Sequence, residues 1–269
     1  MTLIERLSPA KINLMLRVIG RRSDGYHLLQ SCFQILSWGD DMRFIGLPEI
    51  NNSIQLTGFA DLPLRKNLIF QAAEKLRPYA GNSQSVRIEV NKRIPVGAGL
   101  GGGSSNAATT LRVLNELWDC RLADDKLIEI GLQLGADVPF FIVGKSALVT
   151  GIGEIIRPMS FYQGYLLLLF PEVAISTASV FNNAELNRNQ TPLAGEFLSC
   201  PDFWINDCFP VVLKSYPAVA GLFQILSEYM HVRMSGTGST LFALFKDEKQ
   251  ALKAQKTAKQ HCRQALIKI

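Results

Sequence analysis

A glycine-rich segment from Gly97 to Ser105, Gly-Ala-Gly-Leu-Gly-Gly-Gly-Ser-Ser, has the composition of a phosphate-binding loop. Glycine allows backbone N–H groups to converge on an anion, because no Cβ stands in the way. The residues that follow have helical periodicity, and the unpaired amides and dipole at a helix N-terminus attract phosphate. The structural alternative is a tight turn into a helix with Ser104 or Ser105 as its N-cap, although a cap does not require so many glycines.

Common classes of phosphate loop do not match this segment. A Walker A loop has Lys and then Ser or Thr after its last glycine, whereas Gly103 is followed directly by Ser104. The spacing G-x-G-x-x-G is present, but Asp119-Cys120 leads to another helix-like segment, where a dinucleotide-binding fold would have its second strand. The H-R-D and D-F-G motifs of protein kinases are absent from the sequence.

The predicted elements put this loop between a strand and a helix. Alternating apolar and polar residues over 86–91 indicate the strand, and Ala107, Leu111, Leu114 and Trp118 mark one face of the helix. The sequence before and after them also predicts strands over 10–19 and 26–36 joined by an exposed turn, a helix over 67–76, and a helix from about Asp124, as N-cap, to Leu134.

The periodic pattern lapses into turn residues over 157–164, which marks a candidate domain boundary. Beyond it we expect a strand over 165–170, a polar stretch over 182–195, a helix over 218–229, a strand over 241–245 and a basic C-terminal helix. Several basic residues of the last stretch have helical spacing, which is typical of a solvated helix face. They are Lys246, Lys249, Lys253, Lys256, Lys259, Arg263 and Lys268.

Matched segments in the same order resemble the GHMP kinases. The segment from Pro95 through Gly99-Leu100-Gly101 and Ser104-Ser105 to Ala107-Ala108 resembles the second motif of that family, and Ser235-Gly236-Thr237-Gly238 resembles the third. Other segments resemble the diphosphocytidyl-methylerythritol kinases within the family: Ser8-Pro9-Ala10-Lys11-Ile12-Asn13-Leu14, Asp24-Gly25-Tyr26-His27 and Leu134-Gly135-Ala136-Asp137-Val138-Pro139. Matches spread over nearly the whole chain exclude a chance resemblance.

The resemblance implies an α+β, two-domain GHMP kinase fold. Residues 1–157 would form an N-terminal, ribosomal-protein-S5-domain-2-like domain with the ATP phosphate loop, and residues 158–269 a C-terminal, ferredoxin-like domain that contributes to the acceptor site. The implied activity is ATP-dependent phosphorylation of the 2-hydroxyl of 4-diphosphocytidyl-2-C-methyl-D-erythritol, a step of the methylerythritol phosphate pathway to isoprenoids.

Lys11 and Asp137 are the catalytic pair that the resemblance implies. Phosphoryl transfer requires an oriented hydroxyl, a proton acceptor, and positive charge where the transferring group becomes negative. Asp137 follows a helix-ending glycine and precedes a proline, so its backbone is restricted, and a carboxylate near a lysine stays ionised. Lys11 would orient the hydroxyl and stabilise the phosphoryl oxygens. The alternative is a surface lysine and a capping aspartate.

The resemblance also assigns the two ligand sites. ATP would bind at Asn67, Lys92 and the loop of Pro95, Val96, Gly97, Ala98, Gly99, Leu100, Gly101, Gly102, Gly103, Ser104 and Ser105. Because the sequence has no carboxylate cluster for a metal, Mg²⁺ would be held mostly by nucleotide and water, in contact with Ser104 or Ser105. Tyr26 and Phe181 would enclose a cytosine ring whose edge His27 reads, and the acceptor site would be completed by Asn13, Thr177, Gly236, Thr237 and Gly238.

The composition restricts the other possibilities. Hydrophobic residues make up 48% of the chain and charged residues 19%, as in folded globular proteins. The net charge of +5 permits an anionic partner, but the C-terminal lysines lack the interleaved aromatic residues of a nucleic-acid surface. The five cysteines are scattered, and the sequence contains neither an apolar leader nor a membrane-spanning run. We expect a cytoplasmic monomer or homodimer that acts on a small molecule, with no nucleic-acid or membrane partner.

Two alternative functions are weaker. A GHMP kinase for homoserine, mevalonate or galactose would share the phosphate loop, but the Asp24-Gly25-Tyr26-His27 turn disfavours it. A nucleotide-binding protein without catalysis would not need Lys11 and Asp137.

Overall fold

The structure is a computed structural model that describes residues 2–48, 51, 53–59, 62–82 and 84–269. The chain divides into two compact units. The first consists of Met1–Ala10, Trp38–Pro95 and Gly101–Lys145, and the second of Lys11–Ser37, Val96–Leu100 and Ser146–Ile269. The units therefore interleave along the chain, whereas the expected domain boundary after residue 157 cuts it once. That assignment of an ATP-binding and an acceptor-binding half stays a prediction.

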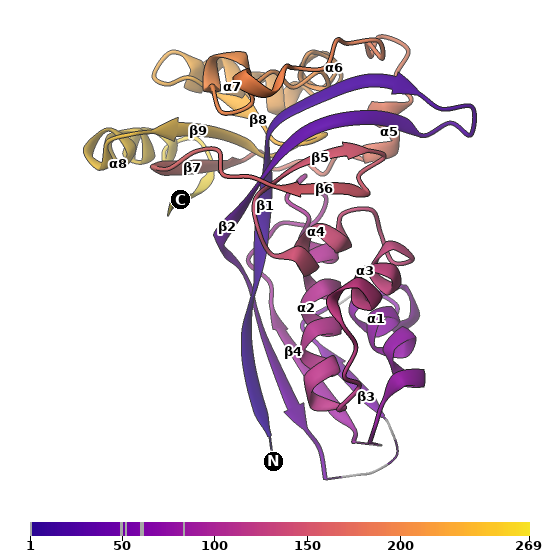
Figure 1. The fold of residues 1–269 in the computed structure, drawn as a ribbon. Coiled ribbons are helices and arrows are strands. Elements are labelled where there is room, and N and C mark those ends of the chain that lie inside the picture. The colour runs from indigo at the N-terminus through magenta and orange to yellow at the C-terminus, as the bar shows by residue number, and fades with distance from the viewer. Residues whose placement is uncertain (1, 49–50, 52, 60–61, 83) are drawn as a thin grey trace. The chain divides into compact units, whose positions relative to one another are not determined.

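The described residues of the first unit form strands on which α-helices pack. Strand β4 (Val86–Asn91) pairs in parallel with β3 (Ile54–Thr57), and antiparallel with the second half of β2 (His27–Gly46). Figure 1 shows the helices together on one side of these strands, with α2 packed against α1 and α4. They are α1 (Leu68–Leu76), α2 (Gly102–Leu117), α3 (Asp124–Leu132) and α4 (Val138–Val143), with short 3₁₀ turns η1 (Leu64–Lys66) and η2 (Arg77–Tyr79).

Helices α1, α2 and α3 occur close to where the sequence predicts them. The apolar face predicted for α2, Ala107, Leu111, Leu114 and Trp118, is no more than 1% exposed, so burial of that face fixes the helix. Asp124 is not the N-cap of α3, because Ala123 takes that position and Asp124 lies in the first turn. There its negative charge still complements the positive end of the helix dipole.

The second unit contains two groups of strands. One consists of the first half of β2 with two further strands, and the other is a separate four-stranded sheet. The first half of β2 pairs with β5 (Ala147–Gly151), which pairs with β6 (Ile155–Pro158). The separate sheet is antiparallel, in the order β10-β7-β9-β8. Its strands are β7 (Tyr165–Phe170), β8 (Arg233–Met234), β9 (Leu241–Phe245) and β10 (Arg263–Lys268). Strand β1 (Leu3–Arg21), which pairs with β2, contributes residues to both units, as β2 does.

The helices of the second unit are packed around one apolar cluster. Leu167 and Leu169 of β7, Val212, and Leu226 are fully buried or nearly so and belong to that cluster. Burial of such side chains, each worth about 1.5–3 kcal/mol, holds the unit together. The helices are α5 (Thr177–Phe181), α6 (Phe209–Ser215), α7 (Pro217–Ser227) and α8 (Glu248–Ala258), with 3₁₀ turns η3 (Gly195–Phe197) and η4 (Pro201–Phe203).

The C-terminus differs from the prediction of a helix that runs to the end of the chain. Helix α8 ends at Ala258, and the chain then returns as β10, which pairs with β7. Ala251, Ala254 and Ala258 are buried while the lysines of α8 are exposed, so the prediction of a solvated basic face is confirmed for α8. Beyond α8, the apolar residues 265–267 pair with the open edge of β7 and are part of its backbone hydrogen-bond ladder. This strand pairing outweighs the helix propensity of the segment.

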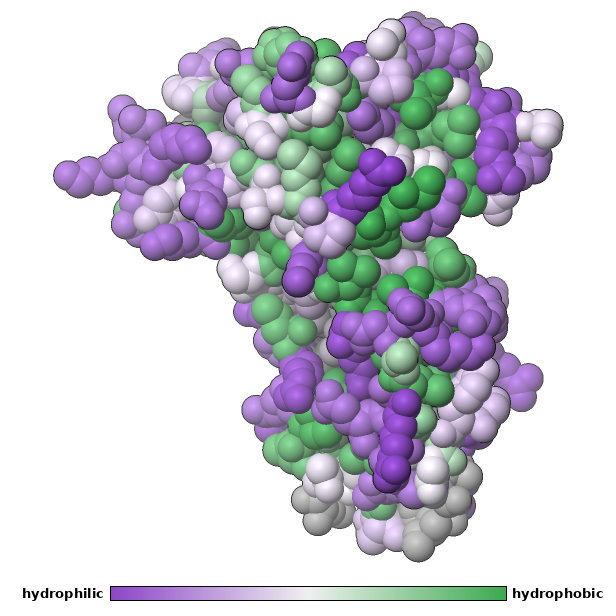
Figure 2. Space-filling view, viewed as in Figure 1, coloured by the Kyte–Doolittle hydropathy of each residue, from purple (hydrophilic) through white to green (hydrophobic). Residues whose placement is uncertain are grey.

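The surface and the cysteines agree with the composition. Figure 2 shows hydrophilic residues spread over the visible face, with apolar residues between them. All five cysteines are thiols, two of them buried. Among the described residues no single helix is long and apolar enough to cross a membrane, and the only helix pair that passes the same test jointly, α6 with α7, is bent by 113°.

Candidate functional site

Alternate glycines of the phosphate loop adopt the left-handed backbone conformation. The φ angles are +69° at Gly97, +74° at Gly99 and +70° at Gly101. Side chains with a Cβ are strained in this region by about 1–2 kcal/mol, so the loop's path requires glycine. Gly101 is the N-cap of α2 and has no side chain to satisfy the first amides. The alternative of a serine cap is therefore wrong, and the first turn of this 16-residue helix has no side-chain cap for its N–H groups, the groups that bind anions at helix N-termini.

The first half of the loop packs against the segment that resembles the third family motif. A Cβ on Gly99 would lie 2.8 Å from the carbonyl oxygens of both Ser235 and Gly238. The Ser235 hydroxyl donates to the Gly99 carbonyl at 3.2 Å, and the Thr240 amide donates to that of Ala98 at 3.3 Å. Two segments that the sequence analysis singled out separately thus lie together in the second unit.

Lys11 is buried rather than on the surface. The residue is only 5% exposed. Its Nζ donates to Asn13 Oδ1 at 2.8 Å and lies 4.3 Å from the centre of the Phe33 ring. Asn13 is held in turn, because its Nδ2 donates to Ser31 Oγ at 2.9 Å and its backbone amide to Ser235 Oγ at 3.0 Å. The surface-lysine alternative is wrong, and the ammonium group is fixed in position by its neighbours.

Asp137 lies in the first unit, at the N-cap position of α4. The amide of Val138 donates to the carbonyl of Gly135 at 3.1 Å, which closes a tight turn around Asp137. A Cβ on Gly135 would lie 3.7 Å from Ser104 Oγ. The turn that carries Asp137 is therefore next to the first turn of α2, where phosphate is expected. The pairing of Asp137 with Lys11 stays a prediction.

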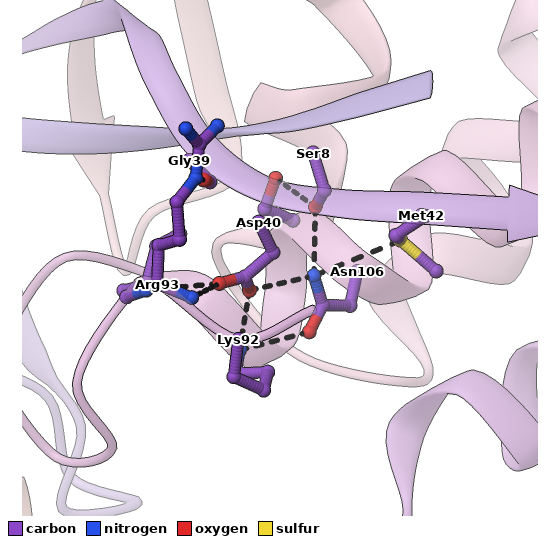
Figure 3. Close-up of polar contacts among 9 residues, drawn as sticks. Ser8, Gly39, Asp40, Met42, Lys92, Arg93 and Asn106 are labelled. Atoms are coloured by element: carbon purple, nitrogen blue, oxygen red, sulfur yellow. Dashed lines mark hydrogen bonds and ion pairs between the residues drawn. The ribbon is translucent and has the colours of Figure 1, made fainter. Parts of the chain in front are cut away.

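A buried carboxylate joins the strands of the first unit to α2 (Figure 3). Asp40 is 0% exposed, and it accepts hydrogen bonds from the backbone amides of Arg93 and Ile94 at 2.8 and 2.9 Å. Lys92 Nζ forms an ion pair with this carboxylate and also donates to Asn106 Oδ1 at 3.1 Å. Asn106 Nδ2 donates to Asp40 at 3.0 Å as well. The carboxylate is thus surrounded by four donors, which satisfy its acceptor sites.

The same network reaches Ser105 of the phosphate loop. Asn106 Nδ2 lies 2.8 Å from Ser8 Oγ, which donates to Ser105 Oγ at 2.8 Å. Ser105 is completely buried, whereas Ser104 is partly exposed. Sequence reasoning missed Asp40 and Asn106, and it assigned Lys92 to ATP without its partner. The interaction of Lys92 with ATP stays a prediction.

Asn67 has one satisfied and one unsatisfied polar atom. Its Oδ1 accepts from the Ile69 amide at 2.9 Å and so caps α1. Its Nδ2 is buried and has no hydrogen-bond partner among the described residues. An unsatisfied buried donor costs about 1–3 kcal/mol, so a ligand that accepts from it would be stabilised. The binding of nucleotide by Asn67 stays a prediction.

Acceptor-site candidates meet in the second unit. The rings of His27 and Phe181 are stacked, with centroids 4.9 Å apart and planes 24° from parallel. Arg188 donates from Nε to His27 Nε2 at 3.0 Å. Burial, reinforced by the charges of Arg188 and Arg21, lowers the pKa of His27, so the ring is neutral at pH 7. Tyr26 is 61% exposed, and the enclosure of a base between Tyr26 and Phe181 stays a prediction.

The remaining acceptor candidates lie in the second unit as well. The hydroxyls of Thr177, at the start of α5, and Thr237 are 3.1 Å apart and hydrogen-bonded. A Cβ on Gly236 would lie 3.0 Å from Asn13 Oδ1, so only glycine leaves that amide undisturbed. The structure thus brings Asn13, Thr177, Gly236 and Thr237 into one unit, with Gly236 against the Asn13 side chain that holds Lys11.

Comparison with known proteins gives matches to one family. The family model of the GHMP kinases N terminal domain matches residues 67–145, and that of the GHMP kinases C terminal matches residues 184–264. A protein of Tolumonas auensis named 4-diphosphocytidyl-2-C-methyl-D-erythritol kinase is 46% identical over 91% of this chain and 85% of its own. One of the same name from Shewanella loihica is 44% identical over 91% and 86%.

Solved structures give the same result. A crystal structure of 4-(cytidine 5'-diphospho)-2C-methyl-D-erythritol kinase aligns with a TM-score of 0.83 and 31% identity, over 98% of both chains. Mevalonate kinase of Methanococcus jannaschii, at 14% identity and a TM-score of 0.67, shares the fold alone. The α+β fold and the resemblance inferred from the sequence are confirmed. The chain belongs to the GHMP kinase family.

Proposed function

We propose that this protein transfers the γ-phosphoryl group of ATP to the 2-hydroxyl of 4-diphosphocytidyl-2-C-methyl-D-erythritol, in the methylerythritol phosphate pathway. The observation that carries the proposal is the 46% identity, over 91% of the chain, to a protein of that name. The stacked His27 and Phe181 rings support it, because a flat base binds against an aromatic face.

The ATP phosphates bind at the glycine loop in this proposal. The amides at the start of α2 and the dipole of that helix attract the phosphates, and Asn67 donates from its unpartnered Nδ2 to the nucleotide. Among the described residues no cluster of His, Cys, Asp or Glu forms a metal cage. Mg²⁺ bound with the nucleotide would neutralise phosphate charge. The partly exposed Ser104 suits contact with Mg²⁺ better than the buried Ser105, whose hydroxyl is bonded to Ser8.

Replacing Gly101 by Ala is expected to weaken ATP binding by roughly 5–30-fold, from the strain of about 1–2 kcal/mol at its left-handed φ. The backbone would relax and move the first amides of α2 away from the phosphates. Titration calorimetry with ATP measures the effect. Gly221→Ala is the control, because a Cβ there has nothing within 4 Å. Equal ATP affinity in both variants would contradict phosphate binding at this loop.

Asp137 and Lys11 carry out the chemistry in the proposal. The Asp137 carboxylate accepts the proton of the 2-hydroxyl as its oxygen attacks the γ-phosphorus, and the bond to the bridging oxygen of ADP breaks. Lys11, held by Asn13 and packed on Phe33, supplies positive charge to the equatorial oxygens in the transition state. Because Lys11 is already ordered, little reorganisation is needed when charge develops.

The acceptor's cytosine binds against the Phe181 ring, with Tyr26 on its other face and His27 at its edge. Replacing Phe181 by Ala is expected to weaken cytidine diphosphate binding by about 1–3 kcal/mol, the scale of base–aromatic stacking, with ATP affinity unchanged. Calorimetry with each nucleotide tests this. The control is Phe203→Ala, a 43% exposed ring that contacts Phe197 instead. Unchanged cytidine diphosphate affinity in Phe181→Ala would refute the assigned base site.

A further inference from the structure

The guanidinium of Arg188 uses nearly all of its hydrogen-bond donors within the second unit, on residues at or near those predicted to bind the phosphoryl acceptor. Its Nη2 donates to the carbonyls of Phe181 and Asn183 at 2.8 and 2.6 Å, and its Nη1 to that of Leu186 at 2.9 Å. Its Nε donates to His27 Nε2 at 3.0 Å. A guanidinium has five N–H donors in a rigid fork, so these four bonds fix its orientation.

These bonds link the two aromatic residues of the acceptor site. Phe181 ends α5, and Arg188 binds the carbonyl of this residue and two carbonyls of the turn that follows. His27 begins β2, 161 positions earlier in the chain. The stacking of the two rings, with centroids at 4.9 Å, is therefore accompanied by a second connection through one guanidinium. Replacement of Arg188 removes its hydrogen bonds to His27 and those to the carbonyls at and after Phe181.

The bond from Arg188 also determines which nitrogen of His27 carries the proton. A neutral imidazole has one N–H donor and one acceptor nitrogen. Because Nε2 accepts from Arg188, the proton lies on Nδ1. Burial, and then the charges of Arg188 and Arg21, lower the pKa of His27, which favours the neutral ring that this assignment requires. A protonated His27 would place an N–H against the guanidinium and lose the bond.

We propose that Arg188 is a specificity-determining positioning residue, which orders the His27 and Phe181 rings and makes His27 Nδ1–H a fixed donor toward the base of the acceptor. This inference rests on the proposed function, since it takes the acceptor's base to bind at these rings. Cytosine has acceptors at N3 and O2, whereas uracil has an N–H at position 3. A fixed donor therefore pairs with the N3 of cytosine and opposes that of uracil.

The test combines a spectroscopic and a binding measurement on Arg188→Lys and Arg188→Gln in the full chain. Long-range ¹H–¹⁵N correlation of the imidazole rings reports the tautomer directly, and a His27→Gln variant assigns the signals among the three histidines. We expect Nδ1–H in the wild type and a shift toward Nε2–H in both variants. Lysine retains the charge without the fork, so an effect in both variants identifies the hydrogen bonds as the cause.

The binding measurement is the ratio of affinities for cytidine and uridine diphosphate. Loss of one oriented hydrogen bond is expected to lower this ratio by roughly 3–10-fold, while ATP affinity, which reports correct folding, stays unchanged. Arg43→Lys is the control, an exposed arginine whose partners, Glu5 and Glu89, are in the first unit. That variant is expected to keep the wild-type tautomer and affinity ratio.

Three results would contradict the inference or the function on which it rests. An unchanged His27 tautomer in both Arg188 variants would show that Arg188 does not set the proton position, and an unchanged affinity ratio would show that it does not determine specificity. A wild type with the expected tautomer but equal affinity for both nucleotides would overturn the proposed acceptor, and with it the specificity role. The tautomer measurement needs no acceptor, so failure of the proposed function and failure of the positioning role are distinguishable.

Discussion

Asp137→Asn is expected to lower kcat by roughly 10²–10⁴-fold, the usual contribution of a positioned general base, while ATP and acceptor affinities stay near those of the wild type. An amide has nearly the size of the carboxylate but does not take the hydroxyl proton. The turn between Gly135 and Val138, which holds Asp137 in position, depends on backbone bonds that the substitution leaves intact. The loss is therefore expected in the chemical step.

Single-turnover kinetics with saturating ATP separate the chemical step from binding. The control is Asp125→Asn, an exposed residue in the first turn of α3, which is expected to keep the wild-type rate. A near-normal kcat in Asp137→Asn would refute the role of general base. A raised KM for the acceptor with unchanged kcat would instead assign Asp137 to binding.

Asp40→Ala is expected to destabilise the first unit by about 3–5 kcal/mol, because it removes a buried carboxylate that is paired with the half-buried Lys92 and bonded to backbone amides. The carboxylate is 0% exposed, and without it the Lys92 ammonium and two backbone amides lose their acceptor. Because Asn106 of α2 also bonds to Asp40, the start of that helix is expected to loosen, which raises the KM for ATP as well.

Thermal and urea unfolding measure the stability change. The neighbouring Asp41 provides a matched control, since its side chain is 52% exposed in an ion pair with Arg93. Asp41→Ala is expected to cost less than about 1 kcal/mol, as exposed pairs do. Equal destabilisation by the two substitutions would contradict the structural role assigned to the buried pair.

The fold could be predicted where a local pattern decides the structure. The alternation of apolar and polar residues located β4, and the helical period of apolar residues located α1 and α2. In each case one face of the element is buried, and this leaves a local pattern whatever the neighbouring elements are. The terminal strand β10 could not be found in this way, since its partner β7 lies some hundred residues earlier and only that pairing makes it a strand. The interleaving of the two units likewise depends on contacts distant in sequence.

The candidate site divides in the same manner. The glycines of the loop and the turn that carries Asp137 have local signatures, because backbone conformation selects their residue types. Asp40 and Arg188 have none. Asp40 acquires its role from Lys92, 52 positions away, and Arg188 from His27, 161 positions away. A charged residue in a polar stretch has the same sequence signature whether it is solvated or buried in a network.

ATP consumption with a panel of acceptors decides whether the protein has the proposed activity: 4-diphosphocytidyl-2-C-methyl-D-erythritol, homoserine and mevalonate. We expect ADP formation with the first acceptor only, and a phosphomonoester at its 2-hydroxyl in the ³¹P spectrum of the product. The Asp137→Asn variant under the same conditions controls for contaminating kinases. Turnover of homoserine or mevalonate with none of the diphosphocytidyl compound would contradict the account and assign the chain to another acceptor within the GHMP kinases.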